Sequence, residues 1–207
     1  MNSGYNDVLG TQTLGAGKLL MKSIQAAILL LLLVSLSWAV LAQSAHEVPN
    51  SQAIPRFDQV AEGFYRGGQP RRQGYEYLKQ LGVKTVINLR AENQEAEEVK
   101  SLGLHYVHIP LSPWERVPES KIQMFFQVLR DRDSYPVFVH CERGTDRTGF
   151  MVGLYRVAFQ DWSADRAYEE ARAHGMWPWH LNLKHQLYEF ANHRAASTRT
   201  SPGRGIP

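Results

Sequence analysis

Two hydrophobic periods alternate along residues 57–194. Short runs rich in β-branched and aromatic residues have the length of strands and lie at 64–68, 83–89, 105–109 and 137–140. The other segments carry apolar residues three and four positions apart, which predicts helices over 71–81, 92–102, 118–132, 147–159, 164–174 and 181–194. This alternation predicts an α/β sandwich around a central sheet. The run at 137–140 is the most continuously apolar, so we expect it near the middle of that sheet.

The amino-terminal residues follow a different pattern. Residues 26–42 read AAILLLLLVSLSWAVLA, without a charged residue, and Lys18 and Lys22 stand just before them. A basic region, an apolar run and small residues ending at Ala42 are typical of a secretory signal. The run is also close to the shortest length that spans a bilayer, so an uncleaved anchor is the alternative.

The sequence therefore divides into a targeting segment, a linker, a domain and a tail. We expect residues 1–42 to be a signal peptide or signal anchor, with Met21 as a second candidate start. Residues 43–56 are predicted to be a linker, 57–194 a catalytic domain, and 195–207 a disordered tail rich in Ser, Thr, Gly and Pro. The expected location is the periplasm or the exterior, or the inner membrane if residues 23–42 stay as an anchor.

Composition narrows the chemistry. The chain has 207 residues, a formal charge of +3 and one cysteine. So small a charge excess does not support nucleic-acid binding. Separately, we expect the protein to be a monomer. A single cysteine excludes an intramolecular disulfide and a zinc site built from several thiolates. That cysteine is either structural or a reactive thiol.

The sequence around the cysteine favours a reactive thiol. Residues 140–149 read HCERGTDRTG between an apolar strand and an apolar helix. Such a loop directs backbone N–H groups inward and ends at a helix N-terminus, which together form an anion site. Arg147 can bind two phosphate oxygens with its guanidinium group. Cys141 would lie beneath the bound phosphate as a thiolate, placed for in-line attack on phosphorus.

Other residues of the loop fit this role. Gly144 permits a tight loop, and Gly149 permits close packing of the helix on the sheet. Thr148 can donate a hydrogen bond to the thiolate and ease its departure. His140 can fix the loop through hydrogen bonds to backbone carbonyls.

The loop resembles the signature His-Cys-x2-Gly-x2-Arg-Ser/Thr-Gly of the cysteine-dependent protein tyrosine phosphatase superfamily. It is most similar to the atypical dual-specificity branch shared by plants, fungi and bacteria. The segments FYRGGQP at 64–70 and VINLR at 86–90, followed by Glu92, resemble further motifs of this branch. The resemblance extends to about Ala191.

The resemblance implies a tyrosine-phosphatase-like fold with a mostly parallel sheet of about five strands flanked by helices. It also implies a phosphocysteine intermediate on Cys141, no metal and no cofactor. The implied substrates are phosphorylated proteins or inositol phosphates. The expected phosphate-binding residues are Glu142, Arg143, Gly144, Thr145, Asp146 and Arg147, with Arg143 directed outward.

The proton donor is left open by the sequence. In the family an Asp on a loop before the signature usually supplies it, but residues 110–118 contain no Asp. Glu115 is the carboxylate of that loop and one candidate. Asp146 is the other, because family members such as myotubularins carry Asp there, linked to acid catalysis and to phosphoinositides. The alternatives are a solvated loop residue for Glu115 and an orienting carboxylate for Asp146.

Two other functions compete with phosphate-ester hydrolysis. One is a binding module that holds phosphorylated ligands without turnover, and the other is a rhodanese-like sulfurtransferase, which Arg147-Thr148-Gly149 disfavours. The histidines of the last helices lack metal-ligand spacing, which indicates surface or packing roles for His174, His180, His185 and His193. Residues 177–179, WPW, are predicted to form a packing turn, with a pocket rim as the alternative.

Overall fold

The computed structural model describes Gln25 and residues 53–200, the last three by their backbone alone. The chain divides into two units, Met1–Val48 and Pro49–Pro207, and the second holds every strand and helix named below. The predicted signal or anchor at 26–42 lies outside the described residues, so its role stays a prediction. Within the part that is described, no helix has the length and hydropathy needed to cross a bilayer.

A five-stranded sheet forms the centre of the domain, in the order β1-β2-β5-β3-β4. Its strands are β1 (Asp58–Ala61), β2 (Phe64–Gly67), β3 (Thr85–Asn88), β4 (His105–His108) and β5 (Val137–His140). β5 pairs in parallel with β2 on one side and β3 on the other, and β4 continues the parallel part. Only β1 is antiparallel, at the edge beside β2. The predicted fold class and the central place of residues 137–140 are confirmed.

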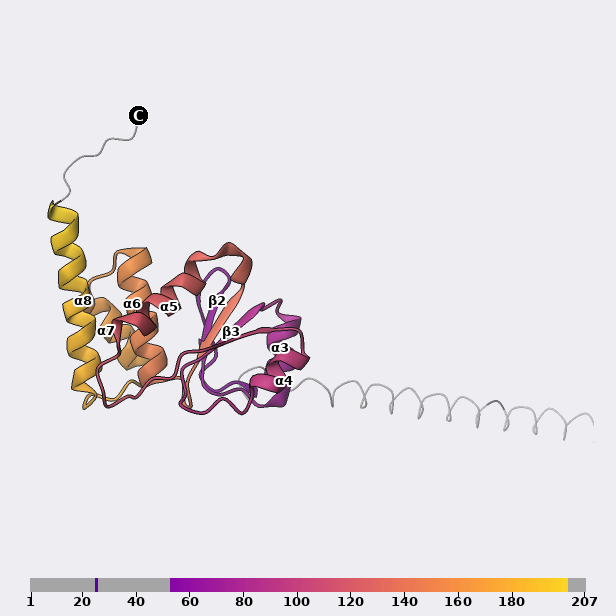
Figure 1. Ribbon diagram of the computed structural model, residues 1–207. Coiled ribbons are helices and arrows are strands. Elements are labelled where there is room, and N and C mark those ends of the chain that lie inside the picture. The colour runs from indigo at the N-terminus through magenta and orange to yellow at the C-terminus, as the bar shows by residue number, and fades with distance from the viewer. Residues whose placement is uncertain (1–24, 26–52, 201–207) are drawn as a thin grey trace, which may run out of the picture. The chain divides into compact units, whose positions relative to one another are not determined.

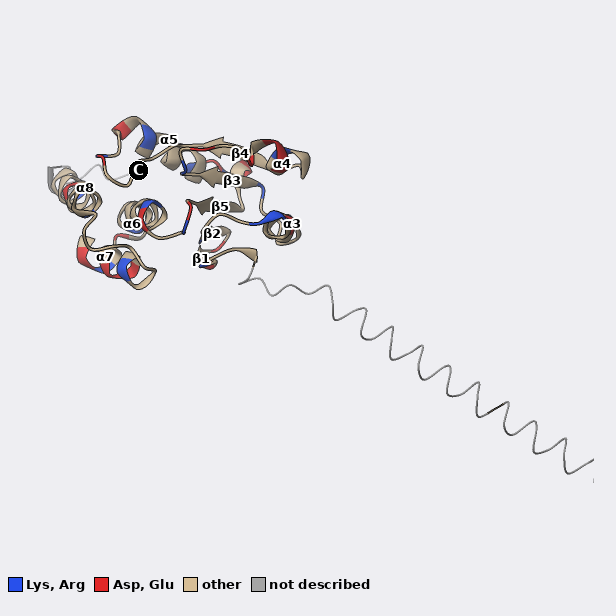
Figure 2. Cartoon of the chain, turned by 90° about the horizontal axis from the view of Figure 1, so that it is seen from below, with Lys and Arg blue, Asp and Glu red and all other residues tan. Residues whose placement is uncertain are grey.

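Helices cover both faces of the sheet (Figures 1 and 2). The helices are α3 (Arg72–Gln80), α4 (Ala96–Ser101), α5 (Glu119–Arg130), α6 (Asp146–Gln160), α7 (Ala164–Ala173) and α8 (Leu181–Thr200), with a short 3-10 turn, η1 (Arg132–Ser134). Figure 2 shows α3 and α4 on one side of the sheet and α5 to α8 on the other. α6 is buried along most of its length because the sheet, α7 and α8 surround it.

The alternation of side chains along β5 divides the core in two. Val137 and Val139 face the cluster under α5 to α8, while Phe138 faces the smaller cluster under α3 and α4. All four residues of β5 are buried, as expected for a strand with helices on both faces. Cys141 follows this strand and belongs to the larger cluster.

Most element boundaries lie within one or two residues of the sequence predictions, and four differences are larger or of another kind. β1 has no apolar alternation to reveal it, because it is a short edge strand with two exposed residues. α4 begins at Ala96 rather than at 92. α8 continues to Thr200, so the predicted disordered tail is helical over residues 195–200, where helix-forming alanines occur. Residues 53 and 54, assigned to the linker, are buried in the smaller core cluster.

Candidate active site

The loop that carries the cysteine connects the central strand to the most buried helix. Cys141 follows β5 directly, and its side chain is 2% exposed. Thr145 is the N-cap residue of α6, which begins at Asp146. The loop therefore lies at the carboxyl edge of the parallel strands and ends at the positive end of a 15-residue helix, where anions bind.

The carbonyl groups of this loop are held from outside. The oxygen of Glu142 accepts from Gln69 N at 3.0 Å, that of Arg143 from Arg56 Nη1 at 3.2 Å, and that of Gly144 from Arg66 Nη2 at 3.2 Å. Within the described residues, no N–H group of residues 142–145 donates to another protein group. The loop thus keeps a set of backbone donors available for an anion.

Glycines allow the loop to lie against the 64–70 segment. Gly144 has a φ of +75°, and a Cβ there would lie 2.5 Å from Gly67 C and from Gly68 N. Gly68 N in turn donates to Pro55 O at 2.6 Å. A side chain at position 144 would therefore meet both a strained backbone and a steric clash.

Two arginines, Arg66 and Arg90, support the loop through contacts with Gly144 and Glu142. Arg66 is 1% exposed, and burial lowers its pKa to about 10, so it stays charged at neutral pH while it binds Gly144 O. Arg90 Nε lies 2.6 Å from Glu142 Oε2, and its other nitrogens lie 3.3 Å from Glu92 and 3.7 Å from Glu95. Three carboxylates thus occupy Arg90, which argues for loop support rather than for substrate binding.

His140 lies fully buried at the foot of the loop. Its ring stacks on Phe138 at 5.6 Å, and its Nδ1 lies 3.4 Å from Cys141 O. Burial lowers the pKa of His140 to about 3, so the ring is neutral at physiological pH. Its Nε2 lies 3.7 Å from Glu95, which joins it to the Arg90 cluster. The structure thus places His140 where a loop-supporting role requires it.

A small pocket of about 110 Å³ opens over the cysteine. Its lining residues are Pro113, Trp114, Cys141, Arg143, Thr145, Asp146, Arg147, Trp177 and His180. Arg147 is partly buried and donates from Nη1 to Leu89 O at 3.4 Å, which holds its side chain beside β3. Thr148 is fully buried, and its hydroxyl has no partner among the described residues. A thiol, a cation and free backbone donors therefore meet at this pocket.

Asp146, one candidate proton donor, lies in the pocket with both oxygens engaged. Its Oδ1 accepts a hydrogen bond from Trp177 N at 2.8 Å, and its Oδ2 accepts one from Thr145 Oγ1 at 2.7 Å. His180 Nε2 lies 3.5 Å from Oδ1. These contacts fasten the segment before α8 to the start of α6.

Glu115, the other candidate, is exposed and is not among the residues that line the pocket. Its backbone oxygen accepts from Asn182 Nδ2 at 2.8 Å. The neighbouring Trp114 lines the pocket instead, with its ring 4.4 Å from that of His180. The Glu115 side chain therefore lies outside this pocket lining, and its role stays a prediction.

Sequence reasoning missed part of the pocket wall. His180 was expected to be a packing or surface residue, yet it is 3% exposed and lines the pocket. Trp177 lines it too, with the exposed guanidinium of Arg143 4.8 Å from its ring, so the rim interpretation of residues 177–179 is the one that fits. The available signal was the dense WPWH run at 177–180.

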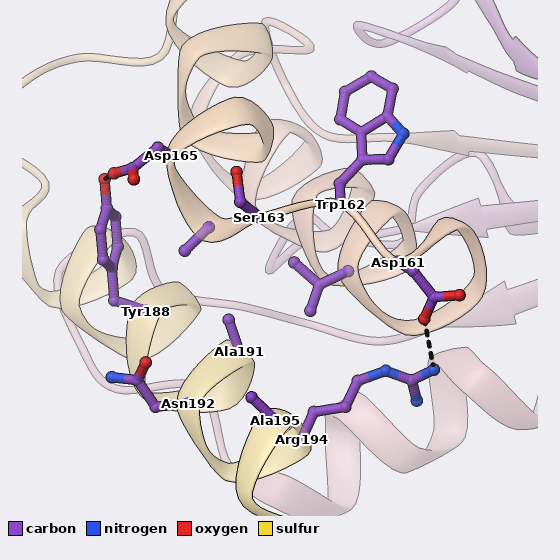
Figure 3. A pocket seen from close by; sticks show the side chains of 11 residues that line it. Asp161, Trp162, Ser163, Asp165, Tyr188, Ala191, Asn192, Arg194 and Ala195 are labelled. Atoms are coloured by element: carbon purple, nitrogen blue, oxygen red, sulfur yellow. Dashed lines mark hydrogen bonds and ion pairs between the residues drawn. The ribbon is translucent and has the colours of Figure 1, made fainter. Parts of the chain in front are cut away.

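A wider hollow of about 470 Å³ lies apart from the cysteine, between the α6–α7 turn and α8 (Figure 3). Four of its polar lining residues form two pairs: Asp161 lies 3.2 Å from Arg194, and Tyr188 donates to Asp165 at 2.6 Å. Its lining includes no cysteine or histidine. No group of three His, Cys, Asp or Glu side chains suited to a metal occurs in the described part of the chain.

Relatives of known structure share this fold. P. aeruginosa TpbA superposes with a TM-score of 0.61 at 23% identity, covering 73% of this chain and 94% of that one. The core catalytic domain of the PP-IP phosphatase SIW14 from S. cerevisiae superposes with a TM-score of 0.58 at 22% identity, covering 71% and 94%. These likenesses confirm the tyrosine-phosphatase-like fold.

Curated proteins match the chain at higher identity. The inositol diphosphatase DSP3 of Arabidopsis thaliana is 29% identical over 130 residues, which are 59% of this chain and 64% of that protein. Two putative tyrosine-protein phosphatases named OCA1, from Yarrowia lipolytica and Mycosarcoma maydis, are matched over 53% and 78% of their own lengths, against 64% for DSP3. The family described as DSP-PTPase phosphatase fused to NAD+ kinase matches residues 43–183, more than half of the chain. The chain therefore belongs to this phosphatase family, within the cysteine-dependent protein tyrosine phosphatase superfamily.

Proposed function

We propose that this phosphatase hydrolyses phosphate monoesters through a phosphocysteine intermediate on Cys141. The observation that carries the proposal is the pocket itself, where Cys141 and Arg147 lie together at the N-terminus of α6. The unpaired N–H groups of residues 142–145 and the Arg147 guanidinium would bind the three non-bridging oxygens of the ester. Bound in this way, the ester would have its phosphorus above the Cys141 sulfur.

Two displacements complete the reaction. The Cys141 thiolate attacks phosphorus, so that an S–P bond forms while the ester P–O bond breaks, and an acid protonates the leaving oxygen. Water then attacks the phosphocysteine, its proton passes to the conjugate base of that acid, and the thiolate leaves. The buried hydroxyl of Thr148 supports the departing thiolate in this step. Asp146 and Glu115 are the sequence-derived candidates for the acid.

The substrate is a phosphorylated protein or an inositol phosphate. A curated relative carries the name inositol diphosphatase, and TpbA has been solved in complex with phosphotyrosine. Both substrate classes share the monoester or phosphoanhydride group that the Cys141 pocket would hold. The pocket is small, so the phosphate and its first substituent fill it, while the rest of the substrate would contact the rim.

The decisive experiment compares the wild-type protein with Cys141→Ser. We expect the wild type to hydrolyse p-nitrophenyl phosphate and to be inhibited by vanadate. Cys141→Ser is expected to lose turnover while it still binds phosphate, because the anion site is intact. A wild-type protein that binds phosphate without any turnover would support the binding module instead. Release of sulfite from thiosulfate and cyanide would support the sulfurtransferase.

We also propose export of the chain and a monomeric state. The basic and apolar pattern before residue 43 supports export, either with cleavage after Ala42 or with residues 23–42 kept as an anchor. Amino-terminal sequencing of the protein recovered from membrane and soluble fractions distinguishes the two. Sedimentation of the purified protein tests the monomeric state.

A further inference from the structure

A buried histidine forms one wall of the Cys141 pocket. His180 is 3% exposed and directly precedes α8. Its backbone N donates to Trp177 O at 3.3 Å, and its backbone O accepts from Lys184 N at 3.2 Å. Both backbone groups are therefore fixed, so the imidazole is held at the pocket rather than free to leave it.

The ring of His180 has one engaged nitrogen and one unpartnered nitrogen. Nε2 lies 3.5 Å from Asp146 Oδ1, and the ring packs against Trp114 at 4.4 Å. Nδ1 is completely buried and has no hydrogen-bond partner among the described residues. Buried polar atoms are nearly always paired, so the unpartnered Nδ1 is a group that a bound ligand completes once a turn of the ring brings it to the pocket surface.

The two carboxylates considered as proton donors, Asp146 and Glu115, are less well placed for that role than His180. Both oxygens of Asp146 already accept hydrogen bonds, from Trp177 N and Thr145 Oγ1. Each oxygen keeps one further lone-pair site, so Asp146 would donate only from the site that these two bonds leave open. Glu115 is exposed and lies outside the pocket lining. The imidazole is the ionisable group of this wall that retains an unused nitrogen.

We propose that His180 is the proton donor of the reaction and that Asp146 is its positioning residue. This rests on the proposed phosphatase function and replaces the carboxylates as the acid. A carboxylate beside one ring nitrogen fixes the orientation and tautomer of an imidazole. The other nitrogen, Nδ1, is then free for the reacting group, which it reaches by a turn of the ring because it has no accessible surface in this structure.

The proton balance closes over the two steps. In the first, the S–P bond forms, the P–O bond breaks, and the proton of the His180 imidazolium passes to the leaving oxygen. In the second, the neutral imidazole accepts a proton from the attacking water as the new P–O bond forms and the Cys141 thiolate leaves. The imidazolium is thereby restored, and no other reactant is required.

The test uses two esters of similar size that differ in leaving group. A nitrophenolate departs with little need of a proton, whereas the phenolate of phenyl phosphate, whose phenol has a pKa of about 10, needs one. In the full chain, purified in detergent, we expect His180→Gln to lower kcat/KM for phenyl phosphate about 100-fold. For p-nitrophenyl phosphate the expected loss is less than about fivefold.

Three matched variants accompany it. His185→Gln changes an exposed histidine of α8 and should leave both rates unchanged. His180→Asn is the second variant should the glutamine disturb folding, and unchanged vanadate inhibition reports that the anion site is intact. Asp146→Asn keeps the acceptor for Trp177 N–H, and we expect the same leaving-group dependence as in His180→Gln, but weaker.

Each contrary result has a clear meaning. Equal losses on the two esters, with vanadate inhibition retained, would overturn the proposal and make His180 a packing residue. A loss confined to phenyl phosphate in Asp146→Asn but absent in both His180 variants would assign the acid to Asp146. Wild-type protein without turnover on either ester would overturn the phosphatase proposal itself, a different outcome from the others.

Discussion

The pocket is bounded by two loops that are held in different ways. Residues 141–145 are fixed by contacts to the 53–70 segment and to Arg90. Residues 110–118 are fixed from α8: Gln186 exchanges two hydrogen bonds with Val117, and Asn182 donates to Pro113 O and Glu115 O. The anion site is therefore held by hydrogen bonds and an ion pair from several segments, whereas residues 113–117 of the opposite wall are held by two side-chain amides of one helix. Substitutions in the two loops should therefore differ in the size and in the kind of their effects on activity.

The largest expected effect comes from adding a side chain at Gly144, where the cysteine loop contacts the backbone of Gly67 and Gly68. Gly144→Ala would place a methyl group 2.5 Å from Gly67 C and from Gly68 N. We expect kcat/KM on p-nitrophenyl phosphate to fall at least about 100-fold, since misplacement of reacting groups by an ångström has that effect. The control is Gly82→Ala, where φ is +82° and nothing lies within 4 Å of the added atom.

Gly82→Ala should lose about 1–2 kcal/mol of unfolding free energy from its backbone conformation and keep its activity. Comparable activity of the two variants would contradict a rigid loop.

A smaller loss is expected from Arg90→Gln. This change removes the ion pair with Glu142 and leaves the buried Glu95 without its cation. We expect kcat to fall about 30-fold with a smaller change in KM, because loop geometry rather than substrate contact is altered. Arg72→Gln, which breaks an exposed pair with Glu76, is the control and should have almost no effect. A selective rise in KM in Arg90→Gln would instead indicate substrate binding.

The third prediction concerns pH and His140. The folded-state pKa of His140 is about 3 and its ordinary value is 6.5, so the unfolded chain takes up a proton first as the pH falls. The free energy of unfolding should therefore decrease on acidification between these two values, by up to about 1.4 kcal/mol per pH unit from this residue. Urea unfolding of wild type and His140→Gln across that window measures the two slopes. Parallel slopes would rule out a buried neutral His140.

The smallest effect is expected in the other loop. Asn182→Ala removes the two hydrogen bonds to Pro113 O and Glu115 O. Partly exposed bonds of this kind contribute about 1 kcal/mol each. We expect a loss of about threefold in kcat/KM, larger for phenyl phosphate than for p-nitrophenyl phosphate if this wall serves the leaving group. Asn192→Ala, on the same helix, is the control.

The difference between the two loops also explains which parts of the site the sequence predicts. The strand, loop and helix around Cys141 are contiguous in the chain, so their periodicity and glycines predict the anion site directly. β5 is central because it is apolar on both faces, a property visible in its first three residues, Val137, Phe138 and Val139.

The opposite wall has no such local pattern. It depends on contacts such as Gln186 with Val117 and Asn182 with Glu115, which join residues 69 and 67 positions apart. The role of His180 likewise depends on where the turn before α8 meets the start of α6. The edge strand β1 was missed because half of it is exposed and its sequence shows no alternation.

The contacts of residues 53–56 have a consequence for maturation. Ile54 is completely buried beside Gly67, Pro55 O binds Gly68 N, and Arg56 binds the carbonyl of Arg143 in the cysteine loop. A processing protease that removes Ile54, Pro55 and Arg56 would take away a support of the cysteine loop and inactivate the enzyme, so an active fragment must retain these three residues.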